Sequence, residues 1–210
     1  MDTESRPAPE QASVVLQKER DLCTVVLNRP AVMNAIGSDM VMALRKAFQA
    51  IGADEEIRVV ILEGSGGNFS SGGDINFLGA GRSAPEDLAI MRSLSQMIES
   101  IREIPQPVLC KVRGVAVGAG ANLALAGDFV VASHNARFQE AFVHLGLSLD
   151  AGGTFFLPRL VGLAKAKELA MLGEAIDGET AASMGLIYKS VSDEALDGEI
   201  AALARTLAAK

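Results

Sequence analysis

The chain has 210 residues, the length of one domain and enough to bury a sizeable core. Hydrophobic residues make up 49% of it, and the net charge is −7 without any basic cluster, which argues against a general nucleic-acid surface. No apolar run is long enough to span a bilayer, and the polar residues 1–13 lack the pattern of a signal or transit peptide. We expect a globular, cytoplasmic protein that binds neither nucleic acid nor membrane.

The first half of the chain alternates predicted strands and helices. Strands are predicted at 14–17 and 23–27, and Ser38 is expected to be the N-cap of the following helix. The short apolar run at 59–62 is typical of a strand that is covered on both faces. Pro85 is predicted to open a second helix. The apolar residues that follow the 3.6 period in the second helix are Leu88, Met91, Leu94, Met97, Ile98 and Ile101.

The second half continues the alternation and then becomes helical. A strand is predicted at 108–112, a turn and helix at 118–126, a further strand at 129–132, and helices at 164–172 and 194–209. Repeated strand–helix units with all-apolar strands predict an α/β fold with a parallel-rich sheet. The two cysteines, Cys23 and Cys110, lie in apolar runs and are expected to be buried thiols without a disulfide.

Two runs of small residues each end an apolar segment, FSSGGDI at 69–75 and GAGANLALA at 118–126. Small side chains let a ligand reach the backbone, and the first turn of a helix leaves N–H groups unpaired and partly positive. Two such turns aimed at one point would bind a carbonyl oxygen that becomes negative during a reaction. The structural alternative is that both runs are tight turns that pack the sheet against helices.

These runs belong to a longer series of motifs: NRPAVMNA at 28–35, FSSGGDI at 69–75, GAGANLALAGD at 118–128, DAGGT at 150–154 and GLI at 185–187. In order and spacing the series resembles the signatures of the crotonase (enoyl-CoA hydratase/isomerase) superfamily, over about residues 14–207. The resemblance implies a spiral of ββα units with a helical C-terminal part and ligand contacts at the strand-to-helix turns. It divides the chain into a flexible N-terminus at 1–12, a core at 13–192 and the start of a C-terminal helical region at 193–210.

The resemblance also carries expectations about assembly and ligand. Family members normally continue past the 194–209 helix with helices that close over the acyl chain and pack against neighbouring subunits. This chain stops at Lys210, so we expect truncated terminal helices, from a shortened product or from a site that lacks part of the lid. The resemblance implies an acyl-CoA substrate in fatty acid or aromatic acid metabolism, a homotrimer or hexamer, and no metal or cofactor beyond the coenzyme A of the substrate.

By resemblance, the oxyanion hole is formed by the backbone N–H groups of Gly73 and Ala119. Losing one such donor typically costs about 3–4 kcal/mol of transition-state stabilisation. The residues that match the family's substrate and coenzyme A contacts are Ala31, Met33, Ser71, Asp74, Ile75, Gly118 and Asn122.

The carboxylates distinguish the possible reactions. Hydratases of the family hold a water between two glutamates, whose positions here are occupied by Asn122 and Phe142. An amide has no proton to exchange near neutrality, and a phenyl ring has none at all. Glu140 lies two positions away in a predicted strand. Two-base hydration is therefore not predicted.

Asp150 remains as the candidate carboxylate for the reaction. Its surroundings resemble the single-aspartate branch that contains epoxyphenylacetyl-CoA and dienoyl-CoA isomerases, in which the aspartate moves a proton between carbon atoms. Leu147, Leu149 and Phe155 would provide an apolar setting that raises the pKa of Asp150. The structural alternative is that Asp150 is the N-cap of a helix that begins near Gly153.

The sequence thus predicts an acyl-CoA isomerase in which Asp150 is the acid and base. Two alternatives within the family remain open, a catalytically silent acyl-CoA binder and a hydratase with a relocated base. A third alternative is a dinucleotide site at 118–123, although Leu123 stands where that motif has a third small residue. Neither histidine is expected to be catalytic, and no spacing suggests a metal site.

Overall fold

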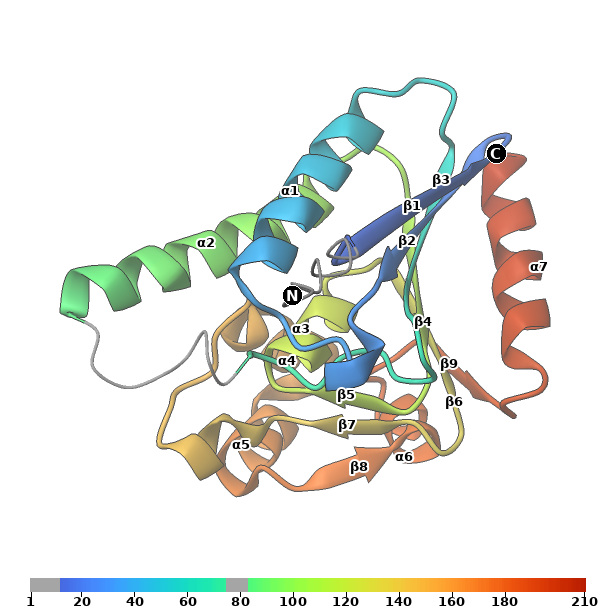
Figure 1. The fold of residues 1–210 in the computed structure, drawn as a ribbon. Coiled ribbons are helices and arrows are strands. Elements are labelled where there is room, and N and C mark those ends of the chain that lie inside the picture. The colour runs from blue at the N-terminus through green and yellow to red at the C-terminus, as the bar shows by residue number, and fades with distance from the viewer. Residues whose placement is uncertain (1–11, 75–82) are drawn as a thin grey trace, which may run out of the picture.

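The computed structural model describes residues 12–74 and 83–210 (Figure 1). The predicted N-terminal segment at 1–12 lies almost wholly outside this part of the chain, as does Ile75. Within the described ranges, no helix has both the length and the apolar character needed to cross a bilayer.

A six-stranded sheet forms the centre of the fold. β1 pairs antiparallel with β2, and every later pair in the sheet is parallel. This agrees with the predicted parallel-rich sheet. Its strands, in spatial order, are β1 (Val14–Glu19), β2 (Leu22–Leu27), β3 (Val59–Gly64), β4 (Val108–Val112), β6 (Phe129–Ser133) and β9 (Lys189–Val191).

A second sheet of three strands lies across the lower part of Figure 1. It contains β5 (Val115–Val117), β7 (Arg137–Gln139) and β8 (Ala175–Asp177), with β5 and β7 parallel. Only two residues separate β4 from β5, yet the two strands belong to different sheets. β6 and β7 divide between the sheets in the same way. Consecutive strand pairs therefore turn from one sheet to the other, which produces the ββα spiral that the motifs implied.

Helices cover both faces of the large sheet. In Figure 1, α1 and α2 lie on one side of it and α7 on the other. The helices are α1 (Ser38–Gly52), α2 (Ala84–Arg102), α3 (Ala119–Leu125), α4 (Gly153–Leu160), α5 (Gly162–Leu172), α6 (Gly178–Ser183) and α7 (Leu196–Ala208), with 3₁₀ turns η1 (Pro30–Val32) and η2 (Ala141–Leu145).

Each covered face has its own apolar cluster. The larger cluster packs α1, α2 and α3 on the sheet and includes the fully buried Phe48 and Leu62. The smaller one packs Leu196 and Ile200 of α7 against Val59 and its neighbours. Burial on both sides explains why the strand predicted at 59–62 is apolar throughout. Cys23 and Cys110 are buried and free, as predicted.

Two predicted helix starts can be compared with the structure. The expectation that Ser38 caps α1 is wrong by one position, because Gly37 is the N-cap and its carbonyl accepts from the Val41 N–H at 3.0 Å. Pro85 lies in the first turn of α2, as predicted. The Glu86 side chain accepts from the Ser83 backbone N–H at 2.7 Å, which closes the start of that helix.

Candidate active site

The start of α3 leaves the backbone N–H of Ala119 without an acceptor among the described residues. Gly118 turns the chain with φ +52°, a conformation that favours glycine, and its own N–H donates to the Gln139 carbonyl at 2.7 Å. The Gly118 carbonyl accepts from the Asn122 N–H at 3.1 Å. Ala119 is the first helical residue, and no described residue accepts a hydrogen bond from its N–H. This donor points out of the helix end, where the dipole is positive.

A second unpaired donor lies in the 69–74 segment. Ile36 donates to the Gly72 carbonyl at 2.8 Å, and the Ile36 carbonyl accepts from the Asp74 N–H at 3.0 Å. These two bonds hold the backbone of Gly73 on either side. No described residue accepts from the Gly73 N–H. The backbone of Gly73 is therefore fixed while its donor stays available.

Gly73 and Ala119, the residues that carry these two donors, line the same small cavity. A Cβ atom on Gly72 would lie 2.5 Å from the Val117 carbonyl oxygen and 3.7 Å from the Ala119 nitrogen, so glycine is needed for the turns to approach. The cavity has a volume of about 70 Å³. Its lining combines backbone of the two turns, an apolar wall and one carboxyl group, from Ser71, Gly72, Gly73, Leu94, Val117, Gly118, Ala119, Ala141, Phe142, Leu145, Leu147 and Asp150.

Among the described residues that line the cavity, Asp150 is the one with an ionisable side chain. Burial raises the pKa of its carboxyl to about 6, and its Oδ1 atom is buried without a hydrogen-bond partner among the described residues. The interpretation of Asp150 as an N-cap is wrong, because Gly152 is the N-cap of α4 and no side chain caps that helix. An ionisable group near neutrality, beside two free N–H donors, can exchange protons with a bound ligand.

The apolar setting of Asp150 differs in part from the prediction. Leu147 lines the cavity as expected, and Leu149 is partly buried against the core. Phe155 is 54% exposed and lies against the Arg159 guanidinium instead of lining the cavity. Phe142, which is 6% exposed, takes part in the lining. The position of the second hydratase glutamate is thus an apolar wall.

Asn122 lies behind the cavity and joins two acidic residues. Its Nδ2 atom donates to the Asp150 backbone carbonyl at 3.0 Å and to Glu140 Oε2 at 3.4 Å. Glu140 follows the end of β7 and is 4% exposed. Burial, aided by the negative charge of Asp150, raises the pKa of Glu140 to about 8, although the Asn122 bond opposes the shift. Sequence reasoning gave Glu140 little weight because its register was not known.

Of the residues predicted to contact the substrate or coenzyme A, Ser71 and Gly118 line the cavity. Met33 follows η1, and its carbonyl accepts from the Ser71 N–H at 2.8 Å, while Ala31 is exposed on η1. Asp74 forms an ion pair with Arg29 at 2.9 Å. Sequence reasoning missed Arg29, although the motif at 28–35 contains it. Ile75 lies outside the described residues.

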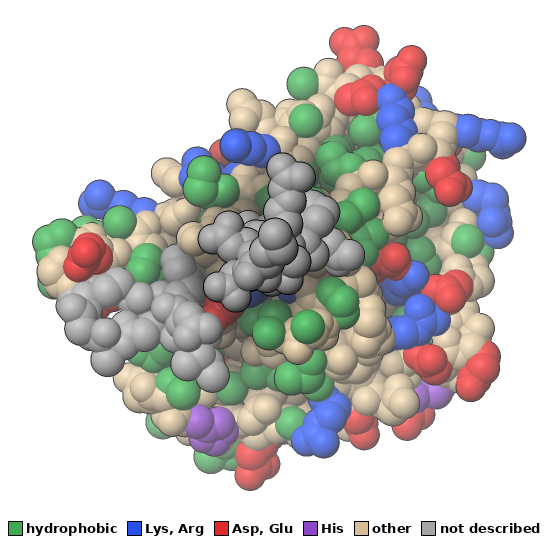
Figure 2. Space-filling view, viewed as in Figure 1, with side chains coloured by type: hydrophobic (Ala, Val, Ile, Leu, Met, Phe, Trp, Pro, Cys, Tyr) green, Lys and Arg blue, Asp and Glu red, His purple; other side chains and the backbone are tan. Residues whose placement is uncertain are grey.

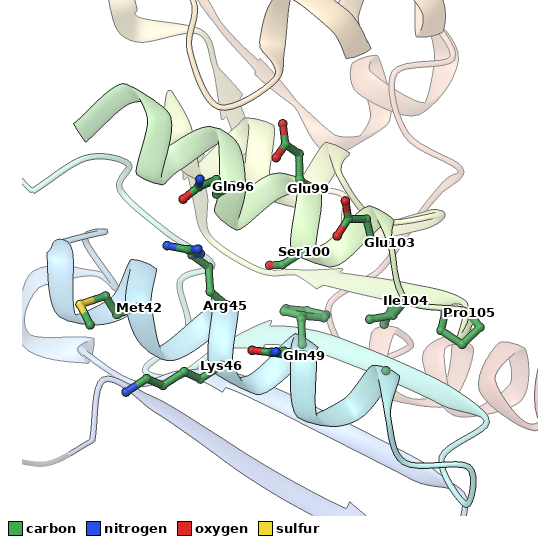
Figure 3. Close-up of a pocket in the computed structure, with 12 residues that line it drawn as sticks. Met42, Arg45, Lys46, Gln49, Gln96, Glu99, Ser100, Glu103, Ile104 and Pro105 are labelled. Carbon is green, nitrogen blue, oxygen red and sulfur yellow. The ribbon is translucent and has the colours of Figure 1, made fainter. Parts of the chain in front are cut away.

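A much larger hollow lies elsewhere, between α1 and α2 (Figure 3). Its volume is about 640 Å³, and its rim carries Arg45, Lys46, Glu99 and Glu103. None of the residues predicted from the motifs lies in it. On the face shown in Figure 2, basic and acidic side chains are interspersed. Within residues 12–74 and 83–210, no three His, Cys, Asp or Glu residues form a potential metal cluster.

Comparison with known proteins gives a consistent result. The profile described as Enoyl-CoA hydratase/isomerase matches residues 17–210. The chain is 38% identical to the 1,2-epoxyphenylacetyl-CoA isomerase of Escherichia coli K12, over 90% of this chain and 74% of that protein. It is 34% identical to the crotonyl-CoA hydratase of Syntrophomonas wolfei, over 94% of this chain and 76% of that protein.

Solved structures of similar proteins also resemble this chain in fold. An enoyl-CoA hydratase from Mycobacterium smegmatis superposes with a TM-score of 0.90 at 33% identity, over 94% of this chain and 77% of that chain. An enoyl-CoA hydratase from Polaromonas sp. JS666 gives 0.87 at 38% identity, with coverage of 94% and 77%. The similar proteins thus carry the names of both isomerases and hydratases, and this chain spans about three quarters of their length.

Proposed function

The chain belongs to the enoyl-CoA hydratase/isomerase (crotonase) family, and from this premise we propose that it isomerises an acyl-CoA thioester by proton transfer. One observation carries the proposal: the Asp150 carboxyl and the unpaired N–H groups of Gly73 and Ala119 border one cavity. The 38% identity to a protein named as an isomerase supports the same reaction.

The chemistry can be written for a 3-enoyl-CoA. The Asp150 carboxylate takes a proton from C2, and the electron pair of that C–H bond moves into the thioester to give an enolate. The Gly73 and Ala119 N–H groups donate to the enolate oxygen, where negative charge develops. Protonated Asp150 returns the proton at C4, and the double bond shifts to C2–C3. A pKa near 6 lets one carboxyl group serve as base and then as acid. Ring isomerisation of an aromatic acyl-CoA would use the same groups.

We assign the coenzyme A part of the substrate to the turns that carry the matching motif residues. Ser71 and Gly118 line the cavity, and Met33 is tied to Ser71 through a backbone hydrogen bond. Ala31 is exposed on η1, and Asp74 is paired with Arg29. These groups offer mainly backbone contacts. We propose no cofactor besides the coenzyme A that the substrate carries.

A hydratase with a relocated base is the second candidate. Glu140 is a buried acid close enough to Asp150 for their charges to interact, and several relatives are named hydratases. Glu140, however, does not line the cavity, and Phe142 does. A water molecule beside Phe142 would find no hydrogen-bond acceptor on that side chain.

The decisive experiment compares Asp150→Asn with the wild-type chain on a panel of enoyl-, dienoyl- and aromatic acyl-CoAs. Isomerisation and hydration are followed separately. Asparagine keeps the shape of the side chain but cannot carry a proton. We expect isomerase turnover to fall by about 10²–10⁴-fold, while acyl-CoA affinity and melting temperature change little. Asp39→Asn, on the exposed first turn of α1, is the matched control and should leave turnover unchanged.

Two results would contradict the proposal. Turnover of Asp150→Asn close to wild type would exclude Asp150 as the proton carrier. Tight acyl-CoA binding by the wild-type chain, with no isomerisation on any member of the panel, would favour the silent binder.

We also propose that the chain forms a homotrimer or hexamer. The support is apolar exposure along α5, where Leu163, Met171 and Leu172 are 63%, 70% and 55% exposed. Exposed apolar area is typical of an interaction surface when it is contiguous. Sedimentation at micromolar concentration should show an oligomer, and a monodisperse monomer would contradict it.

A further inference from the structure

Glu140 is a buried acid that the proposed reaction does not use. It lies between β7 and η2 and is 4% exposed. Its partner is Asn122, which is fully buried on α3 and also bonds the Asp150 backbone carbonyl. One amide group thus connects an acid on one segment with the turn that presents Asp150 on another. Any change at Glu140 can reach Asp150 through this amide.

The cluster formed by Asn122, Glu140 and Asp150 has more hydrogen-bond acceptors than donors. Four buried side-chain atoms have no partner among the described residues, and two of them are Asn122 Oδ1 and Asp150 Oδ1. Both are acceptors, and an ionised Glu140 would add only acceptors. A neutral Glu140 adds one O–H donor to the cluster. Burial with the adjacent negative charge of Asp150 raises the pKa of Glu140 to about 8, which agrees with this requirement at neutral pH.

We propose that Glu140 is a positioning residue that acts as a neutral acid, holding Asn122 and thereby the Asp150 turn in the geometry needed for proton transfer. The proposal rests on the proposed function of Asp150. Glu140 and Asp150 together hold one proton at neutral pH, and the negative charge lies on Asp150. Two acids so close in a buried site do not both ionise easily.

Few other charged groups face the pair. α3 has no ionisable side chain over Ala119–Leu125. On η2, the Nε2 atom of His144 is bonded to the Gly173 carbonyl. On α4, Arg159 bonds the Phe155 carbonyl at the exposed surface. Arg137 on β7 is exposed. Within the described residues, Asp150 is the one charge that shifts the pKa of Glu140.

The test uses the pH dependence of isomerisation, with 3-hexenoyl-CoA as probe. Wild-type kcat should decline above neutrality with a midpoint near 8, as Glu140 ionises and draws the Asn122 amide from the Asp150 carbonyl. Glu140→Gln stays neutral at every pH. It should keep turnover at pH 7 within about threefold and lose the alkaline decline. Glu103→Gln, an exposed acid on the rim of the α1–α2 hollow, should retain the wild-type profile.

Glu140→Ala provides a second measurement, because it removes the partner of Asn122 altogether. We expect kcat at pH 7 to fall by about tenfold or more while KM changes by less than about threefold, as for a lost positioning contact. A wild-type profile without an alkaline decline would overturn the proposal, whether or not the variants fold. A decline that persists in Glu140→Gln would do the same.

The outcomes separate this inference from the proposed function. If Glu140→Gln loses as much turnover as Asp150→Asn, Glu140 itself carries a proton and is not a positioning residue. If Asp150→Asn remains active, the proposed function fails first, whatever Glu140 does. If Asp150→Asn is inactive and Glu140→Gln has the wild-type profile, only the inference fails.

Discussion

Two hollows of this molecule, one large and one small, differ in a way that their sizes do not reveal. The hollow between α1 and α2 is about 640 Å³, and the cavity at the start of α3 is about 70 Å³. In the larger one, charged side chains such as Lys46 and Glu103 are exposed to water (Figure 3). In the smaller one, the Asp150 Oδ1 atom and two backbone N–H groups lack protein partners.

Unpaired buried polar groups are therefore a better indicator of a candidate active site than the volume of a cavity. A solvated charge costs little to maintain and keeps its ordinary proton affinity. A buried donor or acceptor without a partner costs about 1–3 kcal/mol, so a fold retains it only where something compensates. In the small cavity, an acyl thioester would supply that compensation.

The assignment of the reaction to the small cavity would be wrong if the N–H of Ala119 were dispensable. Ala119→Pro removes this donor from the first position of α3, where proline is well tolerated because that N–H makes no helical bond. We expect kcat to fall by about 10²–10³-fold, as for a lost oxyanion donor. Stopped-flow or steady-state isomerisation of 3-hexenoyl-CoA measures the loss.

Ser38→Pro is the matched control for this variant. Ser38 is also the first residue of a helix that follows a glycine, and it is exposed. Its replacement should leave kcat unchanged. If both proline variants lost activity equally, the effect of Ala119→Pro would reflect damage to the helix and not a missing donor.

The residues of the small cavity were largely predictable, whereas the contacts behind it were not. The roles proposed for Gly73 and Ala119 use their backbone N–H groups, and the motifs that contain them are local in sequence. The contact of Asn122 with Glu140 depends on where β7 ends, and periodicity fixes the faces of a strand without fixing its last residue. The Arg29–Asp74 ion pair joins residues 45 positions apart. Such long-range pairs follow from packing, which the sequence pattern leaves open.

The apolar wall predicts that hydration is slow. Phe142 and Asn122 occupy the positions where hydratases of the family have glutamates, and Phe142 lines the cavity. We expect crotonyl-CoA hydration to be at least about 100-fold slower than isomerisation of the best substrate, and below the usual enzyme range of about 1–1,000 per second. Loss of the conjugated thioester absorbance measures hydration. A rate within that range would indicate that Glu140 or Asp150 activates water.

The ionisation of Asp150 predicts smaller changes in activity and stability, and the direction of each change with pH is fixed. Its pKa rises from 3.8 to about 6 on folding. Because the carboxylate form is the proposed base, kcat/KM should fall about tenfold per pH unit below 6. The free energy of unfolding should change with pH in the direction opposite to that of kcat/KM. Between pH 4 and 6 the unfolded chain ionises first, so the free energy of unfolding decreases as pH rises, by about 1–3 kcal/mol in total from this group.

Asp150→Asn tests the predicted pH dependence of stability directly, because asparagine does not titrate. Relative to wild type, its free energy of unfolding should increase as pH rises from 4 to 6, and denaturant titrations at each pH measure the difference. A constant difference between the two proteins would mean that the carboxyl has an ordinary pKa in the folded state. The small cavity would then hold an aspartate that burial does not perturb.

The smallest effect is expected at the large hollow, and α2 allows a comparison within one helix. Leu94 of α2 lines the small cavity and is 2% exposed, whereas Glu103, just past the end of α2, lies on the rim of the large hollow. Glu103→Ala should change kcat/KM by less than about twofold and stability by less than about 0.5 kcal/mol, because its charge is already solvated. Leu94→Ala should cost about 2–5 kcal/mol of stability and reshape the cavity. A tenfold loss of kcat/KM in Glu103→Ala would contradict the assignment and show that the large hollow takes part in the reaction.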